Sequence, residues 1–175
     1  MPATRIALLR GINLGARNKV SMPDLRELFA GLGAEDVTTY VQSGNVVFTG
    51  PLEASAIEAR IKRELGLEIV VLLRTATQLD RIVAANPFAK KASEPKQLHV
   101  TFLAESPAAA RVKELDPERS PPDEFSVVRR EVYLYTPNGY GLTKLSNAYF
   151  EKKLGVTGTS RNWNTVTALA ELARR

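Results

Sequence analysis

The first 74 residues alternate between short apolar runs and amphipathic segments. Four runs have the pattern of strands, at residues 4–10, 37–42, 46–48 and 67–74. Two segments repeat apolar residues at helical spacing, at residues 21–33 and 53–65, and each ends at a glycine. This order predicts a β-α-β-β-α-β unit, the ferredoxin-like split, in which both helices cover one face of a four-stranded antiparallel sheet.

The second half repeats part of this pattern. Strands are predicted at residues 97–103, 125–130 and 132–136, and helices at 75–86, 107–115, 143–154 and 164–173. The order after residue 97 predicts a partial βαββα repeat with an extra C-terminal helix, in which the final strand is missing or supplied from elsewhere. We therefore expect an α/β (α+β) protein of tandem ferredoxin-like halves, 1–88 and 97–175, with the polar segment 89–96 as a linker inside one compact unit.

The amino-acid composition excludes several kinds of functional site. The chain has no cysteine, which excludes disulfides, thiolate nucleophiles and zinc–sulfur sites. Its one histidine, His99, rules out a histidine-rich metal site, and we predict neither a metal nor a cofactor. No apolar run approaches the roughly 18 residues of a membrane span, and the N-terminus lacks the regions of a signal peptide. These features predict a cytoplasmic protein without a membrane partner.

The positive charge is unevenly distributed along the chain. The net charge is +5, and residues 129–175 hold eight Lys or Arg against three acidic residues. The first 20 residues hold four basic side chains and no acidic one. Two basic termini indicate an anionic partner. A solvated surface with a mild charge bias accounts for the same excess, which is small for a nucleic-acid binder.

The loop after the first strand has the composition of a phosphate cradle. Arg10, Arg17 and Lys19 surround two glycines, and Ser21 opens the next helix. Glycine lets backbone N–H groups approach an anion, and a helix N-terminus favours negative charge. The structural alternative is that the glycines occupy positive-φ turn positions, while Asn13 satisfies the backbone groups of the loop.

The next candidates lie at the predicted turn of residues 43–45. A ligand-binding interpretation places Gln42 and Asn45 beside the Arg10 loop as amide recognition groups. The alternative is a hairpin turn, which explains the same residue types without a ligand.

Two segments of the second half complete the candidate set. Trp163 could stack on a base or ring beside Arg161 and Asn162, with Arg161 bound to phosphate. Alternatively, Trp163 anchors the last helix and Asn162 or Asn164 is its N-cap. Lys144, which follows a glycine loop, is either an anion ligand, a general base, or an ordinary surface lysine.

Several motifs together carry a family resemblance. They are LLRGINLG at 8–15, YVQSGNVVF at 40–48, NPF at 86–88, YLYTPNGYG at 133–141 and TSRNWNTV at 159–166. In these motifs the chain resembles the bacterial domain-of-unknown-function family 1697, nearly from end to end. The resemblance implies a tandem ferredoxin-like α/β fold and no established activity.

Three functions are compatible with these observations. The leading hypothesis is a module that binds a phosphate-bearing ligand, nucleic acid or nucleotide, through its basic glycine loops. The first alternative is a small enzyme for a phosphorylated or carboxylated metabolite, with Lys144 or a tyrosine transferring the proton. The second is a protein-interaction or dimerisation module with structural loops. The sequence assigns no oligomeric state.

Overall fold

The computed structural model describes residues 3–175, which divide into two compact units. One unit runs to Arg81 and includes Ala168–Arg175, and the other is Ile82–Thr167. The division lies within the helix Ala76–Ala84, and the linker at residues 89–96 stays a prediction. The last residues of the chain group with the first unit, which the sequence pattern did not indicate.

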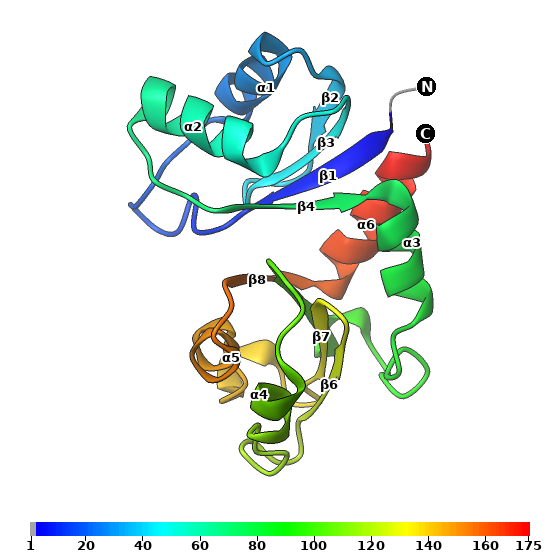
Figure 1. Cartoon of the computed structure of the whole chain (residues 1–175). Coiled ribbons are helices and arrows are strands. Elements are labelled where there is room, and N and C mark those ends of the chain that lie inside the picture. Colours follow the sequence, from blue (N-terminus) through cyan, green and yellow to red (C-terminus); the bar gives the residue numbers. More distant parts are fainter. Residues whose placement is uncertain (1–2) are drawn as a thin grey trace. The chain divides into compact units, whose positions relative to one another are not determined.

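The first unit contains the predicted ferredoxin-like split (Figure 1). Its elements are β1 (Thr4–Leu9), α1 (Met22–Gly31), β2 (Glu35–Thr39), β3 (Asn45–Thr49), α2 (Ala54–Leu65) and β4 (Val71–Thr75). The strands form an antiparallel sheet in the order β2-β3-β1-β4. The β-α-β-β-α-β prediction is thus confirmed, and both α1 and α2 cover one face of the sheet.

Local sequence signals set the ends of these helices. The Ser21 hydroxyl accepts a hydrogen bond from the backbone N–H of Asp24 and caps α1. Gly66 ends α2 in the left-handed conformation, at φ 68°. Between the helices and the sheet, the rings of Phe29 and Phe48 lie 5.3 Å apart in a core that also contains the fully buried Ile57. The helices therefore bury the apolar stripes that their periodicity predicted.

The second unit has a complete ferredoxin-like split. Its elements are η1 (Pro95–Gln97), β5 (Leu98–Leu103), α4 (Ala109–Lys113), β6 (Glu124–Val128), β7 (Glu131–Tyr135), η2 (Tyr140–Leu142), α5 (Asn147–Leu154) and β8 (Gly158–Asn162). The sheet order is β6-β7-β5-β8, which matches that of the first unit position for position. The helix α3 (Ala76–Ala84) precedes these elements and α6 (Trp163–Arg174) follows them.

The prediction of a partial repeat is therefore wrong, because β8 supplies the fourth strand. It pairs antiparallel with β5 along five residue pairs. Its sequence, GTSRN, shows no apolar alternation, so it does not resemble a strand. Its polar side chains have partners: the hydroxyls of Ser160 and Thr101 lie 2.7 Å apart, and Ser160 also donates to Asn147 on α5.

The aromatic residues of β7 point away from α4 and α5 and are used inside the second unit. Tyr133 is buried and its hydroxyl donates to the carbonyl of Ile82 at 2.7 Å. The ring of Tyr135 stacks on Phe88, with 6.1 Å between the ring centroids. The end of α3 and the segment that follows it therefore cover these two tyrosines, whose rings do not form an open surface for stacking.

Candidate functional site

The loop between β1 and α1 folds into a small hairpin. The backbone N–H of Asn13 donates to the carbonyl of Asn18, and that of Arg17 to the carbonyl of Leu14, both at 3.0 Å. Gly15 occupies the first central position of the two-residue turn at φ 59°, a conformation in which glycine is favoured. Gly11, at φ 79°, is likewise left-handed. The interpretation of both glycines as positive-φ turn residues is confirmed.

The side chain of Asn13 fastens this hairpin to the neighbouring loop. Its Nδ2 donates to the carbonyls of Val20 at 3.1 Å and Gln42 at 2.7 Å. Its Oδ1 accepts a hydrogen bond from the Val20 N–H at 2.8 Å. Both amide hydrogens and the amide oxygen are thus used within the protein, which confirms Asn13 as the residue that satisfies loop backbone groups. Asn13 positions the site instead of offering its amide to a ligand.

Replacing Asn13 by glycine should loosen this connection without backbone strain, since Asn13 lies at φ 53° and glycine accepts that conformation. We expect a loss of roughly 1–3 kcal/mol in the free energy of unfolding and faster hydrogen exchange at the Val20 N–H. The matched control is Asn18→Gly, at φ 49°, whose side chain makes one hydrogen bond, to Gly11. Equal Val20 exchange rates in the two variants would contradict the role of Asn13.

The two amide side chains predicted beside the Arg10 loop, Gln42 and Asn45, differ in their exposure. Gln42 is exposed, and its backbone carbonyl holds the hairpin through Asn13. Asn45 is fully buried as the first residue of β3, and its Nδ2 donates to the Tyr40 carbonyl and the Ser43 hydroxyl. Asn45 therefore closes the turn and presents no exposed surface, which corrects its assignment as a ligand-recognition group.

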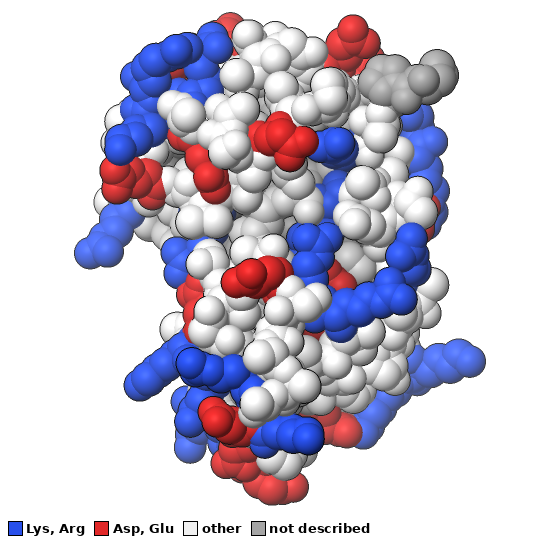
Figure 2. All heavy atoms as spheres, in the orientation of Figure 1, with Lys and Arg blue, Asp and Glu red and all other residues white. Residues whose placement is uncertain are grey.

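Basic side chains gather at this end of the first unit. Arg17 and Lys19 are exposed and form no ion pair within residues 3–175, whereas Arg10 is half-buried. Neither the segment 10–20 nor the segment 40–44 contains an acidic residue. On the face shown in Figure 2, basic and acidic side chains are interspersed. An anion would therefore be attracted by individual cations such as Arg17 and Lys19, and not by a positive potential that extends over the whole face.

Exposed apolar side chains accompany these cations. Leu14 is 65% exposed, Val41 51% and Val70 36%. Leu14 and Val41 each lie one residue from the Asn13–Gln42 hydrogen bond, and the carbonyl of Val70 accepts from the Arg10 N–H. We call this surface the hairpin end and define it by Arg10, Leu14, Arg17, Lys19, Val41, Gln42 and Val70. Reasoning from sequence missed the three apolar members, because their exposure is visible only in the structure.

Val41 is unusual within the hairpin end. It lies at φ 48°, in the left-handed region that β-branched residues rarely occupy. Such a conformation costs of order 1–3 kcal/mol. With half of its surface in water, the side chain recovers little of this cost by burial. Stability alone thus gives no reason for valine at this position.

Lys144 has an exposed side chain and an engaged backbone in the second unit. Its N–H donates to the Ser120 hydroxyl at 3.0 Å, and its carbonyl accepts from Arg119 Nε at 2.8 Å. These bonds hold the proline-rich loop 116–123 against residues 143–146. The helix begins later than predicted, at Asn147 with Ser146 as its N-cap. The structure therefore assigns a role to the backbone of Lys144, while its side chain lies exposed.

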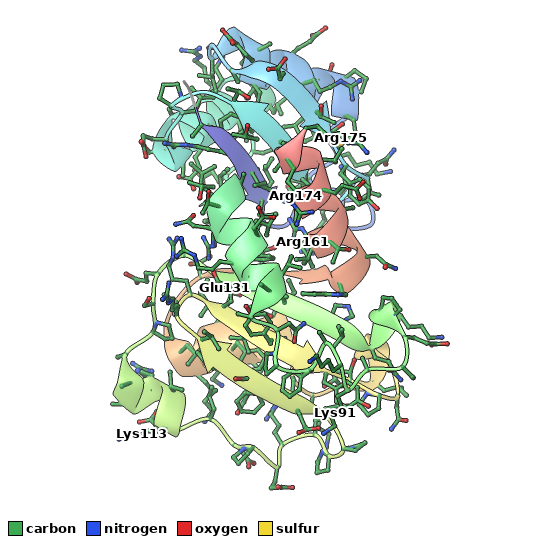
Figure 3. The ribbon with its side chains drawn as sticks, turned by 90° about the vertical axis from the view of Figure 1, so that its right-hand side faces the viewer. Lys91, Lys113, Glu131, Arg161, Arg174 and Arg175 are labelled. Carbon is green, nitrogen blue, oxygen red and sulfur yellow. The ribbon has the colours of Figure 1, made fainter. Side chains whose placement is uncertain are left out.

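The side chains of Arg161 and Asn162 form hydrogen bonds within β8 and at the start of α6. Arg161, marked in Figure 3, lies on β8 with 7% of its surface exposed. Its Nη1 donates to the Thr159 hydroxyl and the Ser160 carbonyl, and burial lowers its pKa to about 10, so it remains charged at neutral pH. Asn162 Oδ1 accepts from the Thr165 N–H, which confirms Asn162 as the N-cap of α6. Trp163, half-buried, is the first residue of that helix.

The structure does not bring the candidates of the second unit to one surface. Ser160 contacts Asn147 on α5, so its neighbour Arg161 points to the opposite face of the sheet. Lys144 lies on the α5 side, beside Arg119 and Ser120. Among the candidate residues, Arg10, Arg17, Lys19 and Gln42 of the first unit lie together at the hairpin end.

Neither a metal centre nor a membrane span is found in the described part of the chain. Within residues 3–175, no three His, Cys, Asp or Glu side chains are grouped so that they could hold a metal ion. No helix in the same range has both the length and the apolar character needed to cross a bilayer.

Comparison with known proteins supports the fold and the family. The solved structure of the conserved bacterial protein SP0830 from Streptococcus pneumoniae matches with a TM-score of 0.73 and 21% sequence identity, covering 100% of both chains. At this identity the likeness establishes the fold alone. No curated protein sequence matches this chain. The model of the family described as "Protein of unknown function (DUF1697)" matches residues 3–133, three quarters of the chain. The family resemblance is thereby confirmed: the protein belongs to the DUF1697 family.

Proposed function

We propose that this protein binds a phosphate-bearing ligand, a nucleic acid or nucleotide, at the hairpin end of its first unit. The observation that carries the proposal is the pairing of the exposed cations Arg17 and Lys19 with loops that hold no acidic residue. An anion that approaches these two loops meets attractive charges. The carboxylates nearest to the hairpin end lie beside Val70, where Glu58 accepts a hydrogen bond from the Val71 N–H and Glu68 pairs with Lys62. The proposal concerns the first unit by itself.

The loop geometry supports the proposal, because the hairpin is ordered before any ligand arrives. Two backbone hydrogen bonds close it, and the Asn13 side chain ties it to the Gln42 carbonyl. A preformed loop avoids the entropic cost of ordering on binding. Arg17 and Lys19 are therefore presented from a defined backbone, although their side chains remain in water.

The alternatives gain less support. For a small enzyme, the Lys144 side chain lies exposed at the surface, and the Tyr133 hydroxyl already donates a hydrogen bond to a backbone carbonyl. For a protein-interaction module, the exposed Leu14, Val41 and Val70 are a favourable observation. In the second unit, Lys144 and Trp163 remain candidate contacts of a phosphate-bearing ligand.

The test is a double charge reversal, Arg17→Glu with Lys19→Glu. Fluorescence anisotropy should be measured with a labelled single-stranded oligonucleotide and with a labelled nucleotide, between about 50 and 200 mM salt. We expect an affinity loss on the order of tenfold, and a salt slope smaller by about 0.7 for each lost phosphate contact on single strands. If the variant lost affinity for both the oligonucleotide and the nucleotide, the two probes would share one phosphate site.

The matched control is Lys90→Glu with Lys113→Glu, which changes the net charge equally at two exposed lysines of the second unit. Lys113 projects from α4 into solvent (Figure 3). The control variant should keep its affinity within about twofold, since neither lysine belongs to the hairpin end. If the Arg17 and Lys19 variant binds as the wild type does, or both variants lose affinity equally, the hairpin end is not the site.

A further inference from the structure

We infer that the hairpin end is shaped for single-stranded nucleic acid, with Leu14 and Val41 against unpaired bases and Arg17 and Lys19 against phosphates. This inference rests on the proposed function and narrows its ligand. It begins from the two apolar side chains that folding does not explain, since both are mostly in water.

Neither apolar residue is required by the fold at its position. Leu14 is 65% exposed beside a two-residue turn, where a polar side chain would serve equally well. Val41 adopts the left-handed conformation at φ 48°, which asparagine or glycine accepts far more readily. Exposed apolar groups that sit beside cations mark a surface meant for contact.

The hairpin places apolar and basic groups next to each other. Leu14 and Arg17 are paired residues on its two strands, so their side chains leave the same face as neighbours. Val41 lies across the Asn13–Gln42 hydrogen bond from Leu14, on the adjoining loop. A ligand that covers this surface therefore meets apolar contact and positive charge within a short distance.

Exposed apolar side chains next to cations favour one class of phosphate-bearing ligand over the others. A free nucleotide needs a concave site that encloses most of its surface, and side chains as exposed as Leu14 do not line such a site. A duplex presents phosphates but hides its base faces by stacking. A single strand offers both the charged backbone and the apolar faces of its bases. Other proteins bind such strands with aromatic stacking surfaces beside basic groups, whereas the aliphatic Leu14 and Val41 would contact the base faces by apolar packing.

The test compares Leu14→Ser with Val41→Asn, as a double variant, against the wild type. Probes are a labelled single-stranded oligonucleotide, the duplex of the same sequence, and a labelled mononucleotide. We expect the wild type to prefer the single strand, and the double variant to lose about tenfold in affinity for it. Its affinity for the duplex, which depends on phosphate contacts, should change by at most about twofold. The matched control is Leu142→Ser, since Leu142 is 78% exposed on η2 of the second unit.

A second measurement guards against a folding artefact. Val41→Asn alone should raise the melting temperature by about 2–4 °C, because asparagine tolerates the left-handed backbone. Weaker binding by a more stable protein cannot be attributed to unfolding. A binding loss accompanied by a lower melting temperature would count against Val41 as a contact residue.

The outcomes separate the inference from the proposed function. Equal wild-type affinity for single strand and duplex, or an unchanged single-strand affinity in the double variant, would overturn the inference. The proposed function would survive that result if Arg17→Glu with Lys19→Glu still lost affinity on the order of tenfold. If that charge-reversed variant bound as the wild type does, both would fail together.

Discussion

Replacing Gly44 by alanine should destabilise the first unit by about 2–5 kcal/mol, from a left-handed backbone and an overpacked contact acting together. Gly44 lies at φ +83°, just before β3. A Cβ there would lie 2.9 Å from Ile12 Cγ1 and 2.9 Å from the carbonyl oxygen of Leu9. A backbone oxygen at the end of a central strand has no room to move aside.

The close approach at Gly44 is a consequence of how the hairpin end is built. The Leu9 N–H donates to the Gly44 carbonyl at 2.8 Å, which draws the turn before β3 against the end of β1. A methyl group there pushes apart the two segments that carry the basic and apolar residues. We therefore expect the variant to lose ligand affinity as well as stability.

Chemical denaturation followed by circular dichroism measures the loss. The matched control is Gly33→Ala in the same unit, because Gly33 also has positive φ, +92°, but no atom lies within 4 Å of a Cβ built there. Gly33→Ala should cost only the conformational part, about 1–2 kcal/mol. If the two variants lost the same free energy, the contacts with Leu9 and Ile12 would not be limiting.

Acid should destabilise the second unit through His99. Its ring lies partly buried on β5 and stacks on Tyr140, with 4.0 Å between the centroids. Its Nδ1 is buried without a hydrogen-bond partner among residues 3–175. The paired residues on the flanking strands, Leu134 and Asn162, carry no charge. Burial, which disfavours the charged imidazolium, therefore lowers the pKa of His99 to about 4.

The direction of the pH effect follows from proton binding. In the unfolded chain His99 titrates near its ordinary pKa of 6.5, so between pH 6.5 and about 4 the unfolded state binds more protons than the folded state. The contribution of His99 to the free energy of unfolding is therefore fully present above pH 6.5, and it is lost as the pH falls from 6.5 to about 4. At pH 5 the loss from this one group should be about 2 kcal/mol.

Urea denaturation at pH 7.5 and pH 5 tests this expectation in the wild type and in His99→Phe. Phenylalanine keeps an aromatic ring against Tyr140 and removes the titration. We expect the wild type to lose about 2 kcal/mol more than the variant between the two pH values. Carboxylates titrate in both proteins and cancel in the difference. An equal loss in the two proteins would show that His99 is solvated in the folded state.

Much of the fold was predictable because it depends on local signals. The apolar period of α1 and α2 and their ends at Ser21 and Gly66 are properties of neighbouring residues, and the structure confirms them. The same holds for Asn162, which was predicted as a possible N-cap from its place before a helical pattern. Short-range hydrogen bonds and side-chain periodicity act over a few residues, so they can be inferred from the chain alone.

The candidate site was predictable only in part. Arg10, Asn13, Arg17, Lys19 and Gln42 do come together, because β1 and β3 are neighbours in the predicted split and their ends meet. Arg161 was one candidate for a phosphate contact, and the structure buries it on β8. No sequence pattern distinguishes a buried arginine from an exposed one when the strand that carries it is itself unrecognised.

The sequence by itself determined the alternation of strands and helices, the glycine turns and the helix caps. The tertiary structure decided where those rules are broken. Polar β8 is a strand because β5 offers it a backbone partner, and Asn45 is buried because its amide closes the turn before it. Leu14 and Val41 are exposed because the hairpin end has no neighbouring element within its own unit to cover them. Periodicity encodes which side chains favour burial, but long-range pairing decides which of them are buried.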